Sequence, residues 1–162
     1  MNIRWLTRLV APWLIDRSEH RIPDLTIHGE MDAPIMHRWW QVPRNRLLNV
    51  YLHNIVGQDE QRALHDHPWW SLTVVLKGSY VDQTIAPGGI HKFEELCEGA
   101  IKFRFARQAH RLEAKKQPCW TLFITGPKIR EWGFHCAKAG WVHWKAFCNP
   151  RDEGLVGSGC EQ

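Results

Sequence analysis

Leu64-His65-Asp66-His67-Pro68-Trp69-Trp70 sets two histidines two positions apart in a stretch typical of the start of a β-strand. Successive side chains of a strand alternate between its faces, so His65 and His67 present both imidazoles to one side. Two imidazoles at one point are a workable pair of ligands for a divalent metal. Ten histidines in 162 residues give roughly 0.6 His-x-His pairs by chance, so the pair needs support from its surroundings.

The residues that follow this stretch supply that support. Gly78 follows His67 by eleven residues, where an extended strand has to turn. Gly99 precedes His110 by eleven residues, with one expected strand between them. A histidine at the start of a further strand could close on the first pair. Three neutral imidazoles on rigid strands would hold a divalent cation and leave open positions for a substrate or oxygen.

Short segments rich in β-branched and aromatic residues continue the strand pattern in both directions along the chain. Turn signals such as Pro43-Arg44-Asn45, Lys77-Gly78-Ser79 and Pro87-Gly88-Gly89 separate them. No helical pattern lies between them, which excludes the crossovers of a parallel sheet and favours an antiparallel sandwich or barrel. The expected strands are residues 37–42, 47–56, 69–76, 79–85, 90–94, 100–105, 110–114, 119–125, 131–135 and 142–147.

The two ends of the chain have different patterns. Apolar residues at three- and four-residue spacing, from Ile3 to Leu14, predict an amphipathic helix with Arg4 and Arg8 on its other side. Such a helix covers a sheet or pairs with a second subunit more often than it lies on a membrane. The last stretch is rich in glycine and charge and is expected to fray. We therefore expect a helix over 1–20, a β-barrel over 24–148 and a flexible tail over 149–162.

The overall composition is that of an ordinary globular domain. With 162 residues, 44% hydrophobic and 23% charged, the chain fits one folded unit. It has no apolar run long enough for a membrane span and none typical of a secretory signal, so we expect a cytoplasmic protein. Its five cysteines are odd in number and widely spaced, which predicts reduced thiols rather than a disulfide framework. The net charge of +4 is spread along the chain, which disfavours a nucleic-acid partner.

Two segments of the chain resemble the paired motifs of the cupin superfamily, G-x5-H-x-H-x3-E-x6-G and G-x5-P-x-G-x2-H-x3-N. His65, His67 and Gly78 match the first motif at the family spacing, and Gly99 and His110 match the second. The residues 65–69, 78–80 and 132–134 are also similar to those of small uncharacterised bacterial and phage cupins. The resemblance implies an all-β fold, a small double-stranded β-helix (jelly-roll barrel), with His65, His67 and His110 as metal ligands.

The chain departs from the cupin motifs at five positions. Asp59 stands in place of the first glycine, Phe105 and Arg107 replace the proline and glycine of the second motif, and Ala114 replaces its final asparagine. Ser71 stands where the fourth ligand is usually a glutamate. A serine hydroxyl is a poor neutral ligand, so we expect Ser71 beside the site and three histidines on the metal. This ligand set resembles that of the ferrous thiol dioxygenases of the superfamily, which makes Fe(II) the preferred metal, with Ni, Zn or Mn as alternatives.

Two further side chains are candidate catalytic residues. Asp82, on the strand after the histidine pair, could replace the missing carboxylate as a ligand or act as a base. Tyr80 has the same parity and could donate a phenolic hydrogen bond inside the barrel. Asp66 has the opposite parity to its neighbours and is expected to brace the turn before Pro68.

Three more residues are candidates for supporting roles. His53 lies on an expected strand close to the motif strands and is a candidate neighbour of the metal ligands. Arg107 or Arg130 could hold a substrate carboxylate by a two-point contact, although a solvated arginine at the rim is the commoner role.

Three functions follow from this pattern. The first is a non-haem Fe(II) dioxygenase acting on a small anionic substrate in the barrel, because three neutral ligands leave the full 2+ charge on the metal. The alternatives are a metal-dependent isomerase of a sugar or keto acid, and a cupin that binds a small ligand without catalysis. We expect a homodimer, with Trp5 and Trp13 of the N-terminal helix as candidate contacts.

Overall fold

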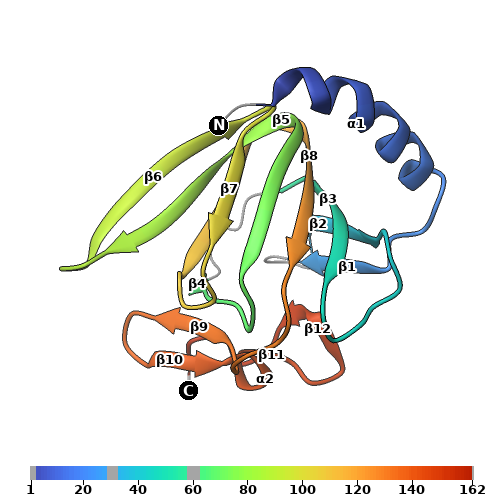
Figure 1. Cartoon of the computed structure of the whole chain (residues 1–162). Helices are drawn as coiled ribbons and strands as arrows, with labels where there is room; N and C mark the ends of the chain where they lie inside the picture. Colours follow the sequence, from blue (N-terminus) through green and yellow to red (C-terminus); the bar gives the residue numbers. More distant parts are fainter. Residues whose placement is uncertain (1–2, 29–32, 58–62, 162) are drawn as a thin grey trace.

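The computed structural model describes residues 3–28, 33–57 and 63–161. It is mostly β, with one curled antiparallel sheet and a helix along its outer side (Figure 1). This curled antiparallel sheet confirms the predicted all-β fold class. The elements are α1 (Arg4–Glu19), β1 (Leu25–His28), β2 (Pro34–Trp40), β3 (Asn49–Ile55), β4 (Leu64–His65), β5 (Ser71–Ala86), β6 (Ile90–Cys97), β7 (Ile101–Arg104), β8 (His110–Thr125), β9 (Gly133–Cys136), β10 (Gly140–His143), α2 (Trp144–Phe147), β11 (Cys148–Asn149) and β12 (Asp152–Val156).

Two long strands, β5 and β8, form the centre of the sheet. Strand β8 pairs with β3 and β5, while β5 also carries β6 and β7 along its other edge. The sequence predicts a break in each long strand, but both run through it. Gly78 lies at a shift in the β5–β8 register with a φ of +77°, and a Cβ there would collide with the backbone oxygens of Lys116 and Pro118. The turn signal at Gly78 therefore marks a bulge that bends a continuous strand.

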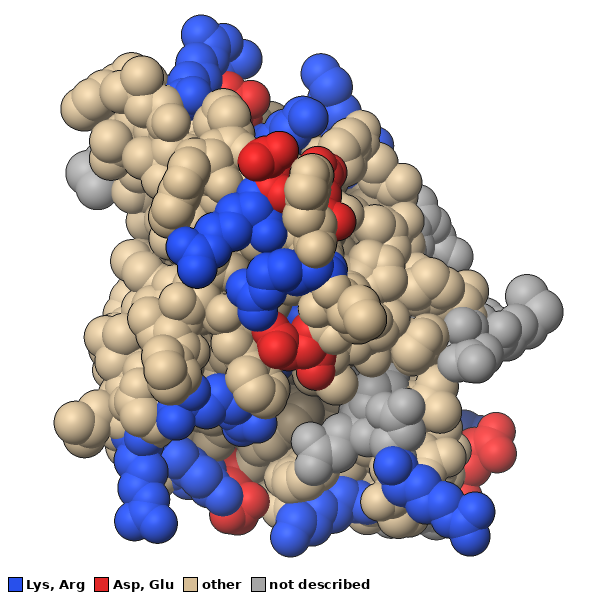
Figure 2. All heavy atoms as spheres, turned by 90° about the vertical axis from the view of Figure 1, so that its right-hand side faces the viewer, with Lys and Arg blue, Asp and Glu red and all other residues tan. Residues whose placement is uncertain are grey.

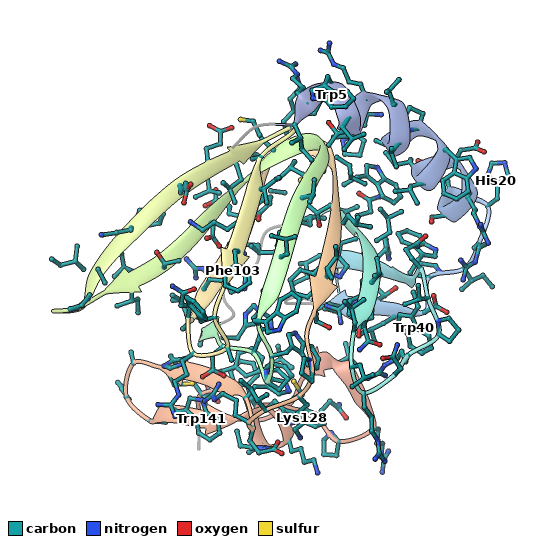
Figure 3. The ribbon with its side chains drawn as sticks, in the orientation of Figure 1. Trp5, His20, Trp40, Phe103, Lys128 and Trp141 are labelled. Atoms are coloured by element: carbon teal, nitrogen blue, oxygen red, sulfur yellow. A yellow bond between two sulfur atoms is a disulfide. The ribbon has the colours of Figure 1, made fainter. Side chains whose placement is uncertain are left out.

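Helix α1 covers the outer face of the sheet, but not with the side that the apolar spacing predicts. Of that predicted side Leu14 is buried, whereas the structure leaves exposed Leu6, Leu9, Val10 and Trp13. Ala11, Leu14 and Ile15 are buried against side chains of β2, β3, β5 and β8, among them the stacked rings of Trp39 and Trp120. The opposite side of the helix stays exposed and carries the large apolar side chains Trp5, Leu9 and Trp13. Figure 3 shows Trp5 on this helix. Neither described helix is long and apolar enough to cross a membrane.

The C-terminal residues differ most from the sequence-based expectation. In place of a fraying tail, β11 and β12 pair with each other, and Cys160 is disulfide-bonded to Cys136. The prediction that all thiols are reduced is therefore wrong for these two cysteines. They are 24 residues apart, and only the return of the chain after β12 brings them together. The last expected strand is also shorter, because the side chain of His143 caps α2 by accepting a hydrogen bond from the Lys145 backbone N–H.

Charged side chains are mixed on the face shown in Figure 2. Lys and Arg side chains occur in several separate groups there, with Asp and Glu side chains between them.

Candidate metal centre

Three histidines meet where β4, the loop after it and the start of β8 come together. β4 pairs with β8 through His65 and His110, and His67 follows two residues later on the same side of the chain. The ring centroids lie 4.9 to 5.2 Å apart, and one nitrogen from each ring lies within 4.8 Å of the others. The structure therefore brings together the three ligands that the sequence predicts.

Two of the three histidines are held in their neutral form. Burial, followed by the charges of neighbouring groups, holds the pKa of His67 and of His110 well below the ordinary value of 6.5. The two Nε2 atoms lie 2.9 Å apart, close to the separation of about 3 Å expected for two imidazoles on one metal. Neutral nitrogen donors at this spacing fit a divalent transition metal held by His65, His67 and His110.

A buried charge pair lies behind His110. The Nδ1 atom of His110 donates to Oδ1 of Asp82 over 2.9 Å, which leaves Nε2 as the lone-pair nitrogen toward His67. The second oxygen of Asp82 pairs with the guanidinium of Arg104, and both side chains are buried. A carboxylate that orients a metal-binding histidine in this way raises the basicity of the ligand. The sequence predicts Asp82 as a ligand or base, whereas its carboxylate is engaged by His110 and Arg104.

Tyr80 belongs to the same buried group. Its side chain is 1% exposed, and burial raises the pKa of its phenol to about 12 although the charge of Arg104 opposes this shift. Tyr80 and Asp82 in turn raise the pKa of Arg104 although burial opposes this shift. The structure thus places the two candidate catalytic residues in a charged layer that supports the triad, and neither lines the cavity described below.

Asp66 braces the strand between two of the ligands, as its parity predicts. Its Oδ1 atom accepts a hydrogen bond from the Gly133 backbone N–H and pairs with Arg130, both at 2.9 Å. Its Oδ2 atom contacts His135 Nε2 at 3.2 Å and accepts from Trp141 Nε1 at 3.1 Å. Burial opposes ionisation, but these donors lower the pKa of the carboxyl below its usual value. The backbone that carries His65 and His67 is therefore tied to β9 and β10.

A cavity of about 410 Å³ opens beside the triad. His65 and His67 form part of its wall. Much of the remaining wall is aromatic and comes from both the sheet and the C-terminal segment, with Tyr51, Trp69, Phe123, Trp132, Phe134 and Trp144. A largely apolar wall with a few polar groups is typical of pockets that bind small molecules.

Arg38 supplies positive charge inside this cavity. Its Nε atom donates to Nε2 of His53 over 2.9 Å, and its guanidinium lies 5.0 Å from the centre of the Tyr51 ring. Burial lowers the pKa of Arg38 to about 10 and, with the charge of Arg38, holds the pKa of His53 well below 6.5. Among the described residues no carboxylate pairs with Arg38. His53, a predicted neighbour of the triad, thus accepts a hydrogen bond from Arg38 and lies close enough to His67 to interact with it.

The remaining predicted residues lie further from the cavity. Ser71 is buried at the start of β5, between Arg104 of β7 and Thr125 of β8 in the sheet. Arg107 is exposed in the turn before β8 and is not part of the cavity wall. Asp59, at the position of the first motif glycine, lies outside the described residues.

Sequence reasoning missed Arg38 and Arg104. The signal for Arg104 was misleading, because Phe103 and Phe105 on either side of it form the apolar half of an alternating strand. In the structure these two rings are 47% and 66% exposed, while Arg104 is 2% exposed. Arg104 of β7 points into the interior because it pairs there with the buried carboxylate of Asp82. Arg38 carries a weaker signal, as a single charged residue within the apolar strand β2.

No family model matches this chain, and no curated protein matches it. Among solved structures it is similar to oxalate decarboxylase from Bacillus subtilis at pH 4.6, with 14% identity and a TM-score of 0.46 over 57% of this chain and 25% of that chain. A second structure of that enzyme, described with Mn(II) centres, has 14% identity and a TM-score of 0.46 over 59% and 26% of the two chains. The chain thus spans about a quarter of the length of these structures. Its three histidines meet as the resemblance of the sequence to the cupin motifs implies.

Proposed function

We propose that this chain is a metal-dependent cupin enzyme, a dioxygenase that uses Fe(II) on a small anionic substrate. The observation that carries the proposal is a histidine triad beside a largely aromatic cavity, with His65 and His67 in the cavity wall and with an arginine in that wall that has no described carboxylate partner. A bound divalent iron would supply a Lewis acid and a redox centre at His65, His67 and His110.

The chain's own residues select and orient the substrate. The Arg38 guanidinium presents planar N–H donors that match a carboxylate, and an anion beside it would offset the cost of burying its charge. His53 holds Arg38 by accepting from its Nε atom, so the remaining donors keep a fixed direction. Arg44 and Lys128 also line the cavity, against the single carboxylate of Asp24 among its described lining residues, so the wall favours anions over cations.

Metal binding tests the first half of the proposal. The protein is stripped with a chelator, reloaded separately with Fe(II), Mn(II), Ni(II) or Zn(II), and analysed for bound metal. We expect one metal per chain, lost in His65→Ala and in His110→Ala. His91→Ala is the matched control, because His91 lies on exposed β6, away from the triad. A protein that binds no metal, or a control that loses it equally, overturns the assignment.

Oxygen consumption tests the second half. The Fe(II)-loaded protein is offered thiols, diketones and small phenols that carry a carboxylate, each beside its uncharged amide. We expect oxygen uptake with a carboxylate compound, and an increase in KM of at least about tenfold in Arg38→Met, since one charged hydrogen-bonded contact is lost. Bound metal with no uptake across the panel refutes the dioxygenase and leaves an isomerase or a binding protein.

A further inference from the structure

Strand β6 lies at an open edge of the sheet. It pairs with β5 alone, from Ser79↔Cys97 to Ala86↔Ile90, and no other segment of the described chain bonds to the backbone of residues 90–96. Figure 1 shows the β5–β6 hairpin projecting from the body of the molecule. Residues 90–95 are all exposed. Alternate residues of such a strand turn unpaired N–H and C=O groups outward, which makes the edge a template for another strand.

The sequence of β6, Ile-His-Lys-Phe-Glu-Glu-Leu-Cys, is complementary to itself when reversed about Phe93. Two copies paired antiparallel about that residue place Lys92 opposite the partner's Glu94 and His91 opposite the partner's Glu95. Ile90 then lies opposite the partner's Leu96, and the two Phe93 rings lie side by side. Directly opposed pairs of unlike charge, or of apolar side chains, are the contacts that stabilise an antiparallel ladder.

We propose that this chain forms a two-fold symmetric dimer in which β6 pairs with β6 of a second copy and extends the sheet across both. Each contact occurs twice in an isologous interface, so one matched pair of charges contributes two ion pairs. Phe93 and Ile90 are 64% and 62% exposed in the single chain, and the dimer covers both. The proposal is independent of the metal site.

The charges select one register. Residues that face each other across the dimer must lie on the same face of the sheet. The two-fold axis can therefore pass only through a single residue of β6, and the neighbouring registers are centred on Lys92 or Glu94. Centring on Lys92 sets two lysines against each other, and centring on Glu94 sets two glutamates against each other. Like charges directly opposite are destabilising, so the register centred on Phe93 is favoured over both neighbours.

Helix α1 is the competing surface, since the sequence analysis suggests Trp5 and Trp13 as dimer contacts. Both rings are exposed, at 69% and 61%. However, Arg4 and Arg8 beside them already pair with Glu98 of the same chain. The charges of β6 also have contacts within the chain, because Glu94 pairs with Lys102 and Glu95 accepts from the Ser79 hydroxyl. The variants below therefore decide between the two surfaces.

The test is a charge exchange in the full chain. Sedimentation velocity over a concentration series gives the dimer dissociation constant of the wild type and of Lys92→Glu, Glu94→Lys and the double variant. We expect each single variant to weaken the dimer by at least about tenfold, because it creates two like-charge contacts. The double variant is expected to restore it to within about threefold of wild type, because both ion pairs return in reversed orientation.

Controls separate the interface from general effects of charge. Lys116→Glu makes the same charge change on exposed β8, away from the β6 edge, and is expected to leave the dissociation constant unchanged. Circular dichroism checks that each variant is folded. A wild type that stays monomeric at all concentrations overturns the proposal, as does a dimer that resists both single variants. Loss of the dimer in Trp5→Ala/Trp13→Ala, with Lys92→Glu silent, assigns the interface to α1 instead.

Discussion

Replacing either partner of the Asp82–Arg104 pair tests how the charges behind the triad support folding. Both side chains are at most 2% exposed, and Asp82 also accepts from His110. Asp82→Asn leaves the Arg104 guanidinium charged and buried without its carboxylate. Removing one partner of a buried pair costs about 3–5 kcal/mol in the free energy of unfolding. We expect Arg104→Met to cost somewhat less, because His110 continues to donate to the stranded carboxylate.

The same two variants are expected to change metal affinity in opposite directions. Asp82→Asn removes the negative charge that orients and polarises His110, a change that typically weakens metal binding about 10–100-fold. The positive charge of Arg104 contributes to the low pKa of His67 and of His110, so it also opposes a cation at their nitrogens. Arg104→Met therefore strengthens metal binding while it weakens the fold.

Urea unfolding followed by tryptophan fluorescence measures the first effect, and competition with a chelator at fixed pH measures the second. Asp16→Asn, on the exposed side of α1, is the matched control and is expected to leave both quantities unchanged. The reasoning fails if the two variants shift metal affinity in the same direction. It also fails if Asp82→Asn costs less than about 1 kcal/mol, since the pair would then not behave as a buried one.

Three further predictions concern groups outside this pair. Asp66→Asn is expected to lower the free energy of unfolding, measured in urea, by about 2–3 kcal/mol. The reason is that it weakens contacts with the buried Gly133 N–H and with three partly exposed side chains. A loss no larger than that of exposed Glu131→Gln would contradict the bracing role. The wild type is expected to lose more stability than Tyr80→Phe as pH rises from 10.0 to about 12. In this range the phenol ionises in the unfolded chain but stays protonated in the folded protein, because its pKa is raised there. Equal losses in urea titrations at each pH would refute the prediction. A thiol reagent at pH 8 is expected to modify exposed Cys97 quickly. It is expected to reach Cys119 only after unfolding, because burial raises the pKa of that thiol to about 12. Rapid modification of Cys119 in the folded protein would show that it is not shielded.

The meeting of the three candidate ligands was predictable because the information lies within a few residues. His65 and His67 share a face by strand parity alone, and the distance from Gly99 to His110 fits one strand and one turn. The braced position of Asp66 follows from the same parity. In each case a local rule of geometry fixes the direction of the side chain.

The charges behind the ligands depend on contacts that the sequence does not show. Asp82 reaches His110 across 28 residues only because β5 and β8 run antiparallel with a bulge near Gly78. Arg104 enters the same group because β7 pairs with the other edge of β5. A shift of one residue in either pairing would turn these side chains to the opposite face. The site residues missed or misassigned from sequence are thus those positioned by register rather than by local pattern.

Ser71 leaves the candidate metal site without a carboxylate at this position, and the buried carboxylate of Asp82 lies behind His110 instead. In the cupin motif that this part of the sequence resembles, a glutamate at this position is usually the fourth, anionic ligand. In this chain the nearest carboxylate of the buried group is Asp82, one imidazole further out and already paired with Arg104. The positive charge of a bound cation is therefore left without a compensating anionic ligand from the triad, while Arg38 adds a second positive charge across the cavity. An anionic substrate that contacts both would supply the negative charge that the protein withholds, and this requirement is what Arg38→Met and the uncharged amide compounds test from opposite sides.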